Sequence, residues 1–460
     1  MLRSLKNCKI QMILIFILFH FSTQRLLSVI EINRHGERTP SPLKIEKISN
    51  LTKIYNTLYG EDKKLTSNGF SQSKLLGQYM RAKYIINKKL ISPDYNKEEV
   101  AIYSTPTQRT IFSANGFISG LFPDSLPIAI YNEKELVNVT SNKTIPIKED
   151  YDFDVKVVPF RVLSNEENRM FIVQKCKLNG TFLLNEENNI TEYPNIFNIS
   201  FAELNETLNE IEKIVNVTID YKGNDLSKIT SELLKMMVMH WASHEGQEKF
   251  LSNNATRTIR KIVLNKIYSS RLTESKKVKL ESSEFFKLIL NHFLKVVQGQ
   301  KRLNFLKEKK YPKYIIYSAH NENIVSLLSN LVSTNNLKKK IEGALENQDD
   351  FDFLYPPYAS SFIFELHRND TNGDYSVSII YNGKIVKTKI DEEIQNRDYS
   401  VDFISFSNFL SSLIDNDYKN LECPDERPPK NVLKERLAKT EKNYLETSKI
   451  GLEFVPSLLK

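Results

Sequence analysis

The sequence predicts an α/β fold with a mixed, largely parallel central sheet, helices on both faces of the sheet, and an inserted, mainly helical cap domain. Short β-branched runs lead to His35, Arg109 and His320, and amphipathic runs with helical spacing follow them. A long helical stretch separates the second run from the third. A chain of 460 residues with 40% hydrophobic and 26% charged side chains is long enough for a large core and an insertion.

The first residues have the layout of a signal peptide. Three basic residues precede an apolar run from Met12 to Phe21, which is too short to span a bilayer comfortably. Cleavage is expected between Ser22 and Arg25. We therefore expect a secreted or lysosomal protein that has no stable membrane span after cleavage, and an amphipathic start or an uncleaved anchor is the alternative.

Glycosylation sequons and cysteines agree with export. Cys8 lies in the expected signal peptide, so the mature chain keeps Cys176 and Cys423, which an oxidising compartment could join and which are otherwise two buried thiols. An Asn-rich composition produces some sequons by chance, so the cluster carries more weight than any single site. The sequons begin at Asn50, Asn138, Asn142, Asn179, Asn189, Asn198, Asn205, Asn216, Asn254 and Asn369.

The first part of the core carries two strands, each followed by a helix. Ser28–Asn33 is rich in β-branched residues and predicts a buried strand that leads into the loop Arg34–Pro40. Apolar residues recur with helical spacing over Ser67–Tyr84. Val100–Tyr103 predicts a short strand, and Arg109 follows within an expected helix start.

The middle of the chain changes character before the strand pattern returns. Helical periodicity dominates Phe201–Ile267, which we interpret as a cap. Tyr314–Tyr317 then predicts a strand ending near His320, with a helix over Ile324–Val332. The strands Ser361–Leu366 and Tyr375–Tyr381 flank Asn372-Gly373 and predict a hairpin. The expected domains are residues 1–24 (signal peptide), 25–137 (first part of the core), 138–284 (cap), 285–426 (second part of the core) and 427–460 (charged tail).

Strand ends define the expected site. Open α/β sheets bind ligands beyond the carboxyl ends of their strands, so we expect Arg34, His35, Arg109 and His320 to converge there. The loop that follows the first strand supplies a nucleophile in His35 and planar guanidinium groups in Arg34 and Arg38. This combination indicates phosphoryl transfer, which needs a nucleophile and cations around the non-bridging oxygens.

These residues resemble a known family. The run Arg-His-Gly-x-Arg-x-Pro at Arg34–Pro40 looks like the signature of the histidine acid phosphatases. The resemblance extends over most of residues 28–140 and 285–425, and little of the cap can be aligned. The further matching segments are Leu65–Gln72, Leu76-Gly77, Met80-Arg81, Tyr103–Thr105, Arg109-Thr110, Ser113-Ala114, Gly120–Pro123, Tyr317–His320 and Pro356–Ser360.

The resemblance implies a role for each residue of the expected site. His35 would form a phosphohistidine, Arg34, Arg38 and Arg109 would bind the phosphate, and His320 would stabilise it alongside. Three arginines offset the charge of the transition state without a metal or another cofactor. The family also implies a disulfide between Cys176 and Cys423.

One position departs from the family pattern. The family usually has an aspartate directly after the second histidine, where it protonates the leaving oxygen, but this chain has Asn321, and an amide has no proton to give. A branch of the family that hydrolyses inositol polyphosphates uses a glutamate one position later, which matches Glu322. We therefore expect Glu322 to be the general acid; in the alternative, Glu322 is a solvated loop residue and the acid is lost.

Three functions remain open at this point. The first is an acid phosphatase that hydrolyses phosphate monoesters, the second is an inositol polyphosphate phosphatase, and the third is a catalytically impaired, phosphate-binding secreted glycoprotein. Retention of His35 with three arginines argues against the third, because simple anion binding needs no nucleophile. The expected partners are small phosphate monoesters, with a homodimer as an option.

Charge and histidine spacing bear on other classes of function. The net charge is +8, but basic and acidic residues are interspersed, without the basic stripe of a nucleic-acid-binding protein. His240 and His244 have the i, i+4 spacing of two metal ligands on a helix, but no metalloprotease glutamate lies between them. We favour helix packing or a substrate-facing wall for this pair and expect no metal.

Overall fold

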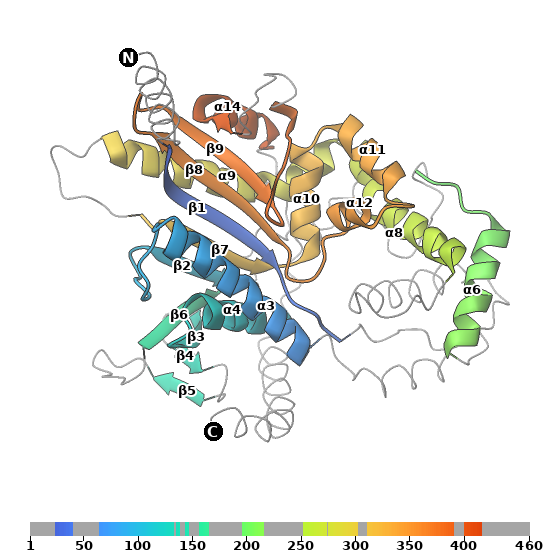
Figure 1. Cartoon of the computed structure of the whole chain (residues 1–460), viewed down its shortest axis with the longest axis horizontal. Coiled ribbons are helices and arrows are strands. Elements are labelled where there is room, and N and C mark those ends of the chain that lie inside the picture. The colour runs from blue at the N-terminus through green and yellow to red at the C-terminus, as the bar shows by residue number, and fades with distance from the viewer. Residues whose placement is uncertain are drawn as a thin grey trace, which may run out of the picture.

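A central sheet organises the computed structural model (Figure 1). The strands are β1 (Gln24–Arg34), β2 (Val100–Ser104), β3 (Ser125–Asn132), β4 (Glu135–Asn138), β5 (Lys143–Pro146), β6 (Lys156–Val162), β7 (Tyr314–Ala319), β8 (Ser361–Asn369), β9 (Tyr375–Tyr381), β10 (Lys384–Ile385) and β11 (Val401–Asp402). The structure describes residues 24–39, 64–132, 135–138, 143–146, 156–164, 196–215, 252–273, 275–301, 311–390 and 400–415.

The strand order confirms the expected mixed sheet. Across the sheet the order is β10-β9-β8-β1-β7-β2-β6-β3-β4-β5, and β11 pairs with β9. The five neighbouring strands β1, β7, β2, β6 and β3 are parallel. Beyond β1, strands β8, β9 and β10 are added antiparallel, and beyond β3, strands β4 and β5 are added antiparallel. The hairpin predicted around Asn372-Gly373 is the β8–β9 pair.

Helices cover both faces, as the sequence predicts. On one face lie α3 (Ser67–Met80), its π-helical continuation η2 (Arg81–Asn87) and α4 (Gln108–Leu121), and on the other lie α9 (Ser275–Lys301), α10 (Asn321–Leu331) and α14 (Phe403–Leu413). Because side chains alternate along a strand, β1 serves both cores: Val29 packs on the α3–α4 side, and Ile30 and Ile32 pack on the α9–α10 side.

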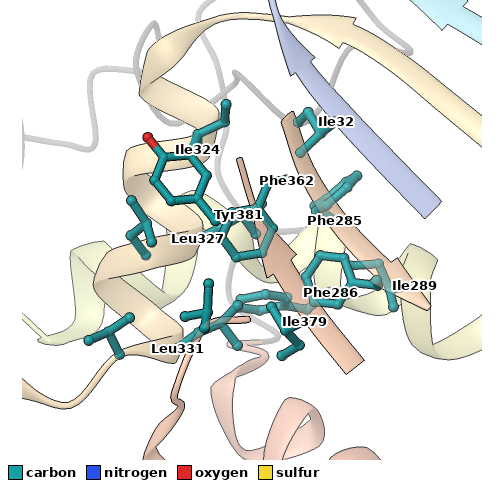
Figure 2. Close-up of a cluster of buried hydrophobic side chains, with 14 of the residues drawn as sticks. Ile32, Phe285, Phe286, Ile289, Ile324, Leu327, Leu331, Phe362, Ile379 and Tyr381 are labelled. Carbon is teal, nitrogen blue, oxygen red and sulfur yellow. The ribbon is translucent and has the colours of Figure 1, made fainter. Parts of the chain in front are cut away.

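The core on the α9–α10 side is aromatic and tightly buried (Figure 2). Helical spacing places Phe285, Phe286 and Ile289 of α9 on this core, and the facing residues of α10 recur at the same period. Burial of each such side chain contributes roughly 1.5–3 kcal/mol relative to exposure. The other side chains drawn and labelled in this core are Ile32, Ile324, Leu327, Leu331, Phe362, Ile379 and Tyr381.

Helices α3 and α4 meet backbone to backbone on the other face. A Cβ atom placed on Gly77 of α3 would lie 2.0 Å from the carbonyl oxygen of Phe117 in α4. Such a distance is far inside van der Waals contact, so only glycine allows the two helices to approach this closely. This contact fixes α4, whose first turn carries Arg109.

Strand β6 corrects the expected start of the cap. Lys156–Val162 lies inside the range 138–284, yet it pairs in parallel with both β2 and β3 near the centre of the sheet. Pro159 and the charged residues at either end masked its strand pattern, although its side chains alternate between exposed and buried positions. Likewise α9 runs through residue 284 without a break, so the cap does not end there.

Helices α6 (Phe201–Val215) and α8 (Asn253–Thr273) represent the helical middle of the chain, and they lie beside each other at the end of the molecule remote from β4 and β5 (Figure 1). Two further short helices, α11 (Thr334–Gly343) and α12 (Gln348–Leu354), follow α10.

No helix among the described residues is long and apolar enough to cross a membrane. Several expectations lie outside the described residues: the signal peptide up to residue 23, the disulfide between Cys176 and Cys423, the pair His240 and His244, and the charged tail 427–460.

Candidate active site

His35 directly follows β1 at the carboxyl edge of the parallel strands. Its backbone nitrogen donates to the carbonyl oxygen of Ala319 at the end of β7, with a distance of 3.0 Å. The next residue must be glycine, because a Cβ atom on Gly36 would lie 2.0 Å from the carbonyl oxygen of Gly69 in the first turn of α3. The backbone nitrogen of Gly36 donates to Oγ of Ser113 in α4, at 2.9 Å. The loop is therefore held from β7, α3 and α4.

A hydrogen bond to its own loop selects the tautomer of His35. Nδ1 lies 2.8 Å from the carbonyl oxygen of Gly36, and because a carbonyl only accepts, Nδ1 carries the proton. Nε2 consequently keeps its lone pair when the ring is neutral. Burial, followed by the charges of Arg34 and Arg109, lowers the pKa of His35 well below 6.5. The imidazole is therefore neutral, and available as a nucleophile, even in mildly acidic solution.

Arg34 is the last residue of β1 and is 3% exposed. Its backbone nitrogen donates to the carbonyl oxygen of Ser360 (2.8 Å), and Nη1 donates to the carbonyl oxygen of Pro356. The guanidinium carbon lies 4.1 Å from the ring centroid of Tyr358. The segment Pro356–Ser360, which precedes β8, thus fixes this guanidinium from two sides.

Arg109 and His320 meet across the ends of α4 and β7. Nη2 of Arg109 donates to Nδ1 of His320 at 3.1 Å, so Nε2 of His320 carries the ring proton and donates to Oγ1 of Thr105 at 3.0 Å. His320 is also the N-cap of α10, and its backbone nitrogen donates to Oδ1 of Asn323 at 3.2 Å. The rings of His35 and His320 stand edge to face with centroids 5.6 Å apart.

Arg38 and Glu322 complete the group. Arg38 is half-buried, and its Nη1 donates to the carbonyl oxygen of Thr39 at 2.9 Å. Glu322 is exposed in the first turn of α10, and Asn321 is half-buried beside it. Burial lowers the pKa of Arg38, and it lowers the pKa of Arg109 to about 10. The nearby Glu322 carboxylate raises both pKa values and so partly offsets burial. Glu322 therefore lies at the rim of the arginines.

The three arginines form a concentrated positive site. After burial, the charge of Arg34 lowers the pKa of both Arg38 and Arg109, and the charge of Arg38 lowers that of Arg109 as well. The Nε atoms of Arg34 and Arg109 are buried without a hydrogen-bond partner among the described residues. Crowded guanidinium groups with unused donors are suited to a dianion such as phosphate.

The sequence of this chain matches a known superfamily and its acid phosphatases. A sequence model of the histidine phosphatase superfamily (branch 2) matches residues 25–382. The chain belongs to this superfamily. The prostatic acid phosphatase of Bos taurus is 24% identical over 357 residues, covering 76% of this chain and 75% of the relative. The lysosomal acid phosphatase of Rattus norvegicus is 25% identical over 360 residues, covering 76% and 68%. The resemblance to histidine acid phosphatases is confirmed.

Two solved structures share the fold of this chain. A phytase from Citrobacter braakii has a TM-score of 0.52 and 14% identity, covering 86% of this chain and 99% of the phytase. The phytase from D. castellii has a TM-score of 0.52 and 15% identity, covering 86% and 80%. At these identities the likeness establishes the fold alone.

The structure brings together all the predicted residues of the phosphate site, and it adds two that sequence reasoning did not single out. Thr105 binds His320, and Tyr358 stacks on Arg34. Both belong to segments that resemble the family, which was the only signal pointing to them. Among the described residues, no cluster of three or more His, Cys, Asp or Glu side chains is arranged to hold a metal ion.

Proposed function

We propose that this histidine phosphatase hydrolyses phosphate monoesters through a phosphohistidine formed on Nε2 of His35. The observation that carries the proposal is the hydrogen bond from Nδ1 of His35 to the carbonyl of Gly36. This bond leaves the Nε2 lone pair free on a buried, neutral ring that is surrounded by Arg34, Arg109 and His320. Anion binding alone requires the arginines but not this tautomer.

The first step transfers the phosphoryl group to the enzyme. Nε2 of His35 attacks phosphorus, the ester P–O bond breaks, and the leaving oxygen takes a proton from the carboxyl group of Glu322. Arg34, Arg38 and Arg109 neutralise the charge on the non-bridging oxygens during this transfer. The first step needs a protonated carboxyl group, so turnover is expected to favour acidic pH.

The second step restores the enzyme. Water attacks phosphorus, the P–N bond to His35 breaks, and the carboxylate of Glu322 accepts the proton of the water. Inorganic phosphate leaves, and His35 is again neutral. The exposed position of Glu322 supports this role, because the carboxyl group is reached by both the leaving alcohol and the attacking water.

Two substrates test the assignment of the acid. An aryl phosphate has a leaving group that needs no protonation, whereas an alkyl phosphate does. Comparable turnover of both at pH 4–7 is the expected result and supports Glu322. Turnover of the aryl ester alone would mean that the acid is missing, and turnover of neither would favour the phosphate-binding glycoprotein.

The narrower alternative, an inositol polyphosphate phosphatase, rests on the spacing of His320 and Glu322. Competing hydrolysis of inositol hexakisphosphate and an aryl phosphate separates the two activities. A kcat/KM value for the inositol ester that is tenfold or more above that of the aryl ester would establish the alternative. The converse ratio is expected for a general acid phosphatase.

Export through the secretory pathway is part of the same proposal. The sequon residues Asn198, Asn205 and Asn254 are exposed, which supports it. Enzymatic removal of N-glycans is expected to lower the mass of the protein made in a eukaryotic host. A non-reduced digest is expected to contain a peptide pair linked through Cys176 and Cys423, and free thiols at both positions would contradict the disulfide.

A further inference from the structure

Tyr358 carries a buried hydroxyl group that has no hydrogen-bond partner among the described residues. The side chain is 9% exposed, and its Oη atom is buried. Leaving a hydroxyl buried and unpaired costs on the order of 1–3 kcal/mol. A phenylalanine would fill nearly the same volume without that cost, so packing alone does not account for the hydroxyl group.

The ring of Tyr358 belongs to the wall of the arginine site. It lies over the guanidinium of Arg34, 4.1 Å from Cζ to the ring centroid, and its centroid is 5.8 Å from that of the His35 ring. Burial lowers the pKa of Arg38 and of Arg109, and Tyr358 acts in the opposite direction on both. The side chain of Tyr358 therefore lies against Arg34 and close to Arg38 and Arg109.

The backbone around Tyr358 is fixed against the nucleophile. Ala359 adopts a left-handed conformation with φ of 56°, which a non-glycine residue takes only when the surrounding structure imposes it. The backbone nitrogen of Ala359 donates to the carbonyl oxygen of His35 at 3.2 Å. The backbone nitrogen of Ser360 donates to the carbonyl oxygen of Pro357, also at 3.2 Å. These bonds place the side chain of Tyr358 in a set position relative to His35.

We propose that the hydroxyl group of Tyr358 donates a hydrogen bond to a non-bridging oxygen of the phosphoryl group, while its ring holds Arg34 in place. The proposal rests on the proposed phosphatase function and deepens it. The unused Nε donors of Arg34 and Arg109 belong to the same site, so the phosphoryl group would satisfy buried donors that are otherwise unpaired. A neutral donor adds a hydrogen bond to the dianion without adding to the repulsion among the arginines.

The test separates the hydroxyl group from the ring. Tyr358→Phe keeps the ring on Arg34, and Tyr358→Leu removes both. Inorganic phosphate is titrated into each full-length variant by calorimetry, and thermal unfolding is followed without phosphate. Tyr358→Phe is expected to weaken phosphate binding about 10- to 100-fold while its melting temperature stays the same or rises. Tyr358→Leu is expected to lose more affinity, because Arg34 also loses one of the two contacts that hold it.

A matched control comes from a buried tyrosine whose hydroxyl group is paired. Oη of Tyr268 donates to the carbonyl oxygen of Leu354 at 2.9 Å. Tyr268→Phe is therefore expected to lower the melting temperature and to leave phosphate affinity unchanged. The opposite signs of the two stability effects distinguish a hydroxyl group kept for a ligand from one kept for the fold.

The outcomes discriminate between this inference and the proposed function. Unchanged phosphate affinity in Tyr358→Phe, with an active wild-type enzyme, overturns the role of the hydroxyl group alone. A wild-type protein that binds phosphate but does not hydrolyse an aryl phosphate overturns the phosphatase function, and the Tyr358 contact is still measured by calorimetry. A wild-type protein that fails to bind phosphate overturns both.

Discussion

Nη2 of Arg109 donates to Nδ1 of His320 over 3.1 Å, which couples an arginine of the candidate site to its second histidine. The acceptor role of Nδ1 requires the proton of His320 to lie on Nε2, where Thr105 accepts it at 3.0 Å. The tautomer of His320 and the position of Arg109 thus depend on a threonine hydroxyl that never needs to touch the substrate.

Replacing this hydroxyl group is the first prediction. Thr105→Val is expected to destabilise the protein by about 1–3 kcal/mol, because the Nε2–H group of His320 loses its buried acceptor. It is also expected to lower kcat/KM for an aryl phosphate, since His320 and Arg109 are no longer held together. Urea unfolding and steady-state kinetics measure the two effects. Thr105→Ser keeps the acceptor and should restore both, and equal losses in the two variants would contradict this explanation.

Removal of the proposed nucleophile is expected to separate catalysis from binding. His35→Ala is expected to lower turnover by on the order of 10⁴-fold or more, because no phosphohistidine can form. The three arginines remain, so calorimetric binding of inorganic phosphate should persist within about tenfold. A variant that retained turnover would show that His35 is not the nucleophile.

The acid is tested by Glu322→Gln. Hydrolysis of an alkyl phosphate is expected to fall about 10²- to 10⁴-fold, whereas that of an activated aryl phosphate should change little. The residue is exposed, so thermal unfolding should be unaffected. Adding Asn321→Asp to this variant places a carboxyl group at the family's usual position, and recovery of alkyl turnover in the double variant is expected. Equal losses on both substrates in Glu322→Gln would argue for an electrostatic role instead.

The buried carboxyl group of Glu31 is expected to stabilise the folded protein more at acidic pH than at neutral pH. Glu31 accepts a hydrogen bond from the hydroxyl group of Tyr314, and burial raises its pKa from 4.5 to about 7. The folded state therefore keeps this proton between pH 4.5 and 7, where the unfolded chain releases it. The contribution of this protonated carboxyl group to the free energy of unfolding is fully present below pH 4.5. It falls by about 3 kcal/mol as the pH rises through 7.

Substitution of this carboxyl group should flatten the pH dependence. Glu31→Gln is expected to remove most of the fall in the free energy of unfolding between pH 4.5 and 8, measured in urea. Glu342→Gln, at an exposed position of α11, is the control and should follow the wild-type curve. A Glu31 variant whose stability fell as steeply as that of the wild type would exclude this carboxyl group as the cause.

The contact between α3 and α4 predicts opposite effects for two glycines. Gly77→Ala is expected to destabilise the protein by about 2–4 kcal/mol, because the new methyl group would meet the backbone of Phe117 at 2.0 Å. A Cβ atom on Gly299, in α9, would meet nothing within 4 Å. Gly299→Ala should therefore stabilise the helix by about 0.5–1 kcal/mol. Thermal unfolding measures both, and equal effects would refute the steric explanation.

Local patterns predicted the centre of the sheet and the residues that gather at the candidate site. β-Branched runs mark β1, β2 and β7 because these strands are buried, and the loop after β1 keeps nucleophile and cations within a few residues. Strand β6 escaped prediction because Pro159 interrupts its pattern, and its place in the sheet depends on its neighbours β2 and β3.

Other features depend on distant partners and leave no local signal. Tyr358 faces Arg34 from a segment in which Ala359 adopts a positive φ, and the identity of an alanine does not indicate that conformation. The tautomer of His320 depends on Thr105 and Arg109, both more than 200 residues away, with separations of 215 and 211. Sequence reasoning identified which groups are present, and tertiary contacts decide how each is oriented.

The hydrogen bond from Arg34 to the carbonyl group of Pro356 joins residues 322 positions apart. During synthesis, the phosphate site therefore remains incomplete until nearly the whole core has left the ribosome. A nascent or truncated chain that ends before Pro356 carries the entire signature loop without the segment that orients Arg34. Hydrolytic activity would then report on completed folding, and a partly built chain would be unable to attack phosphate esters.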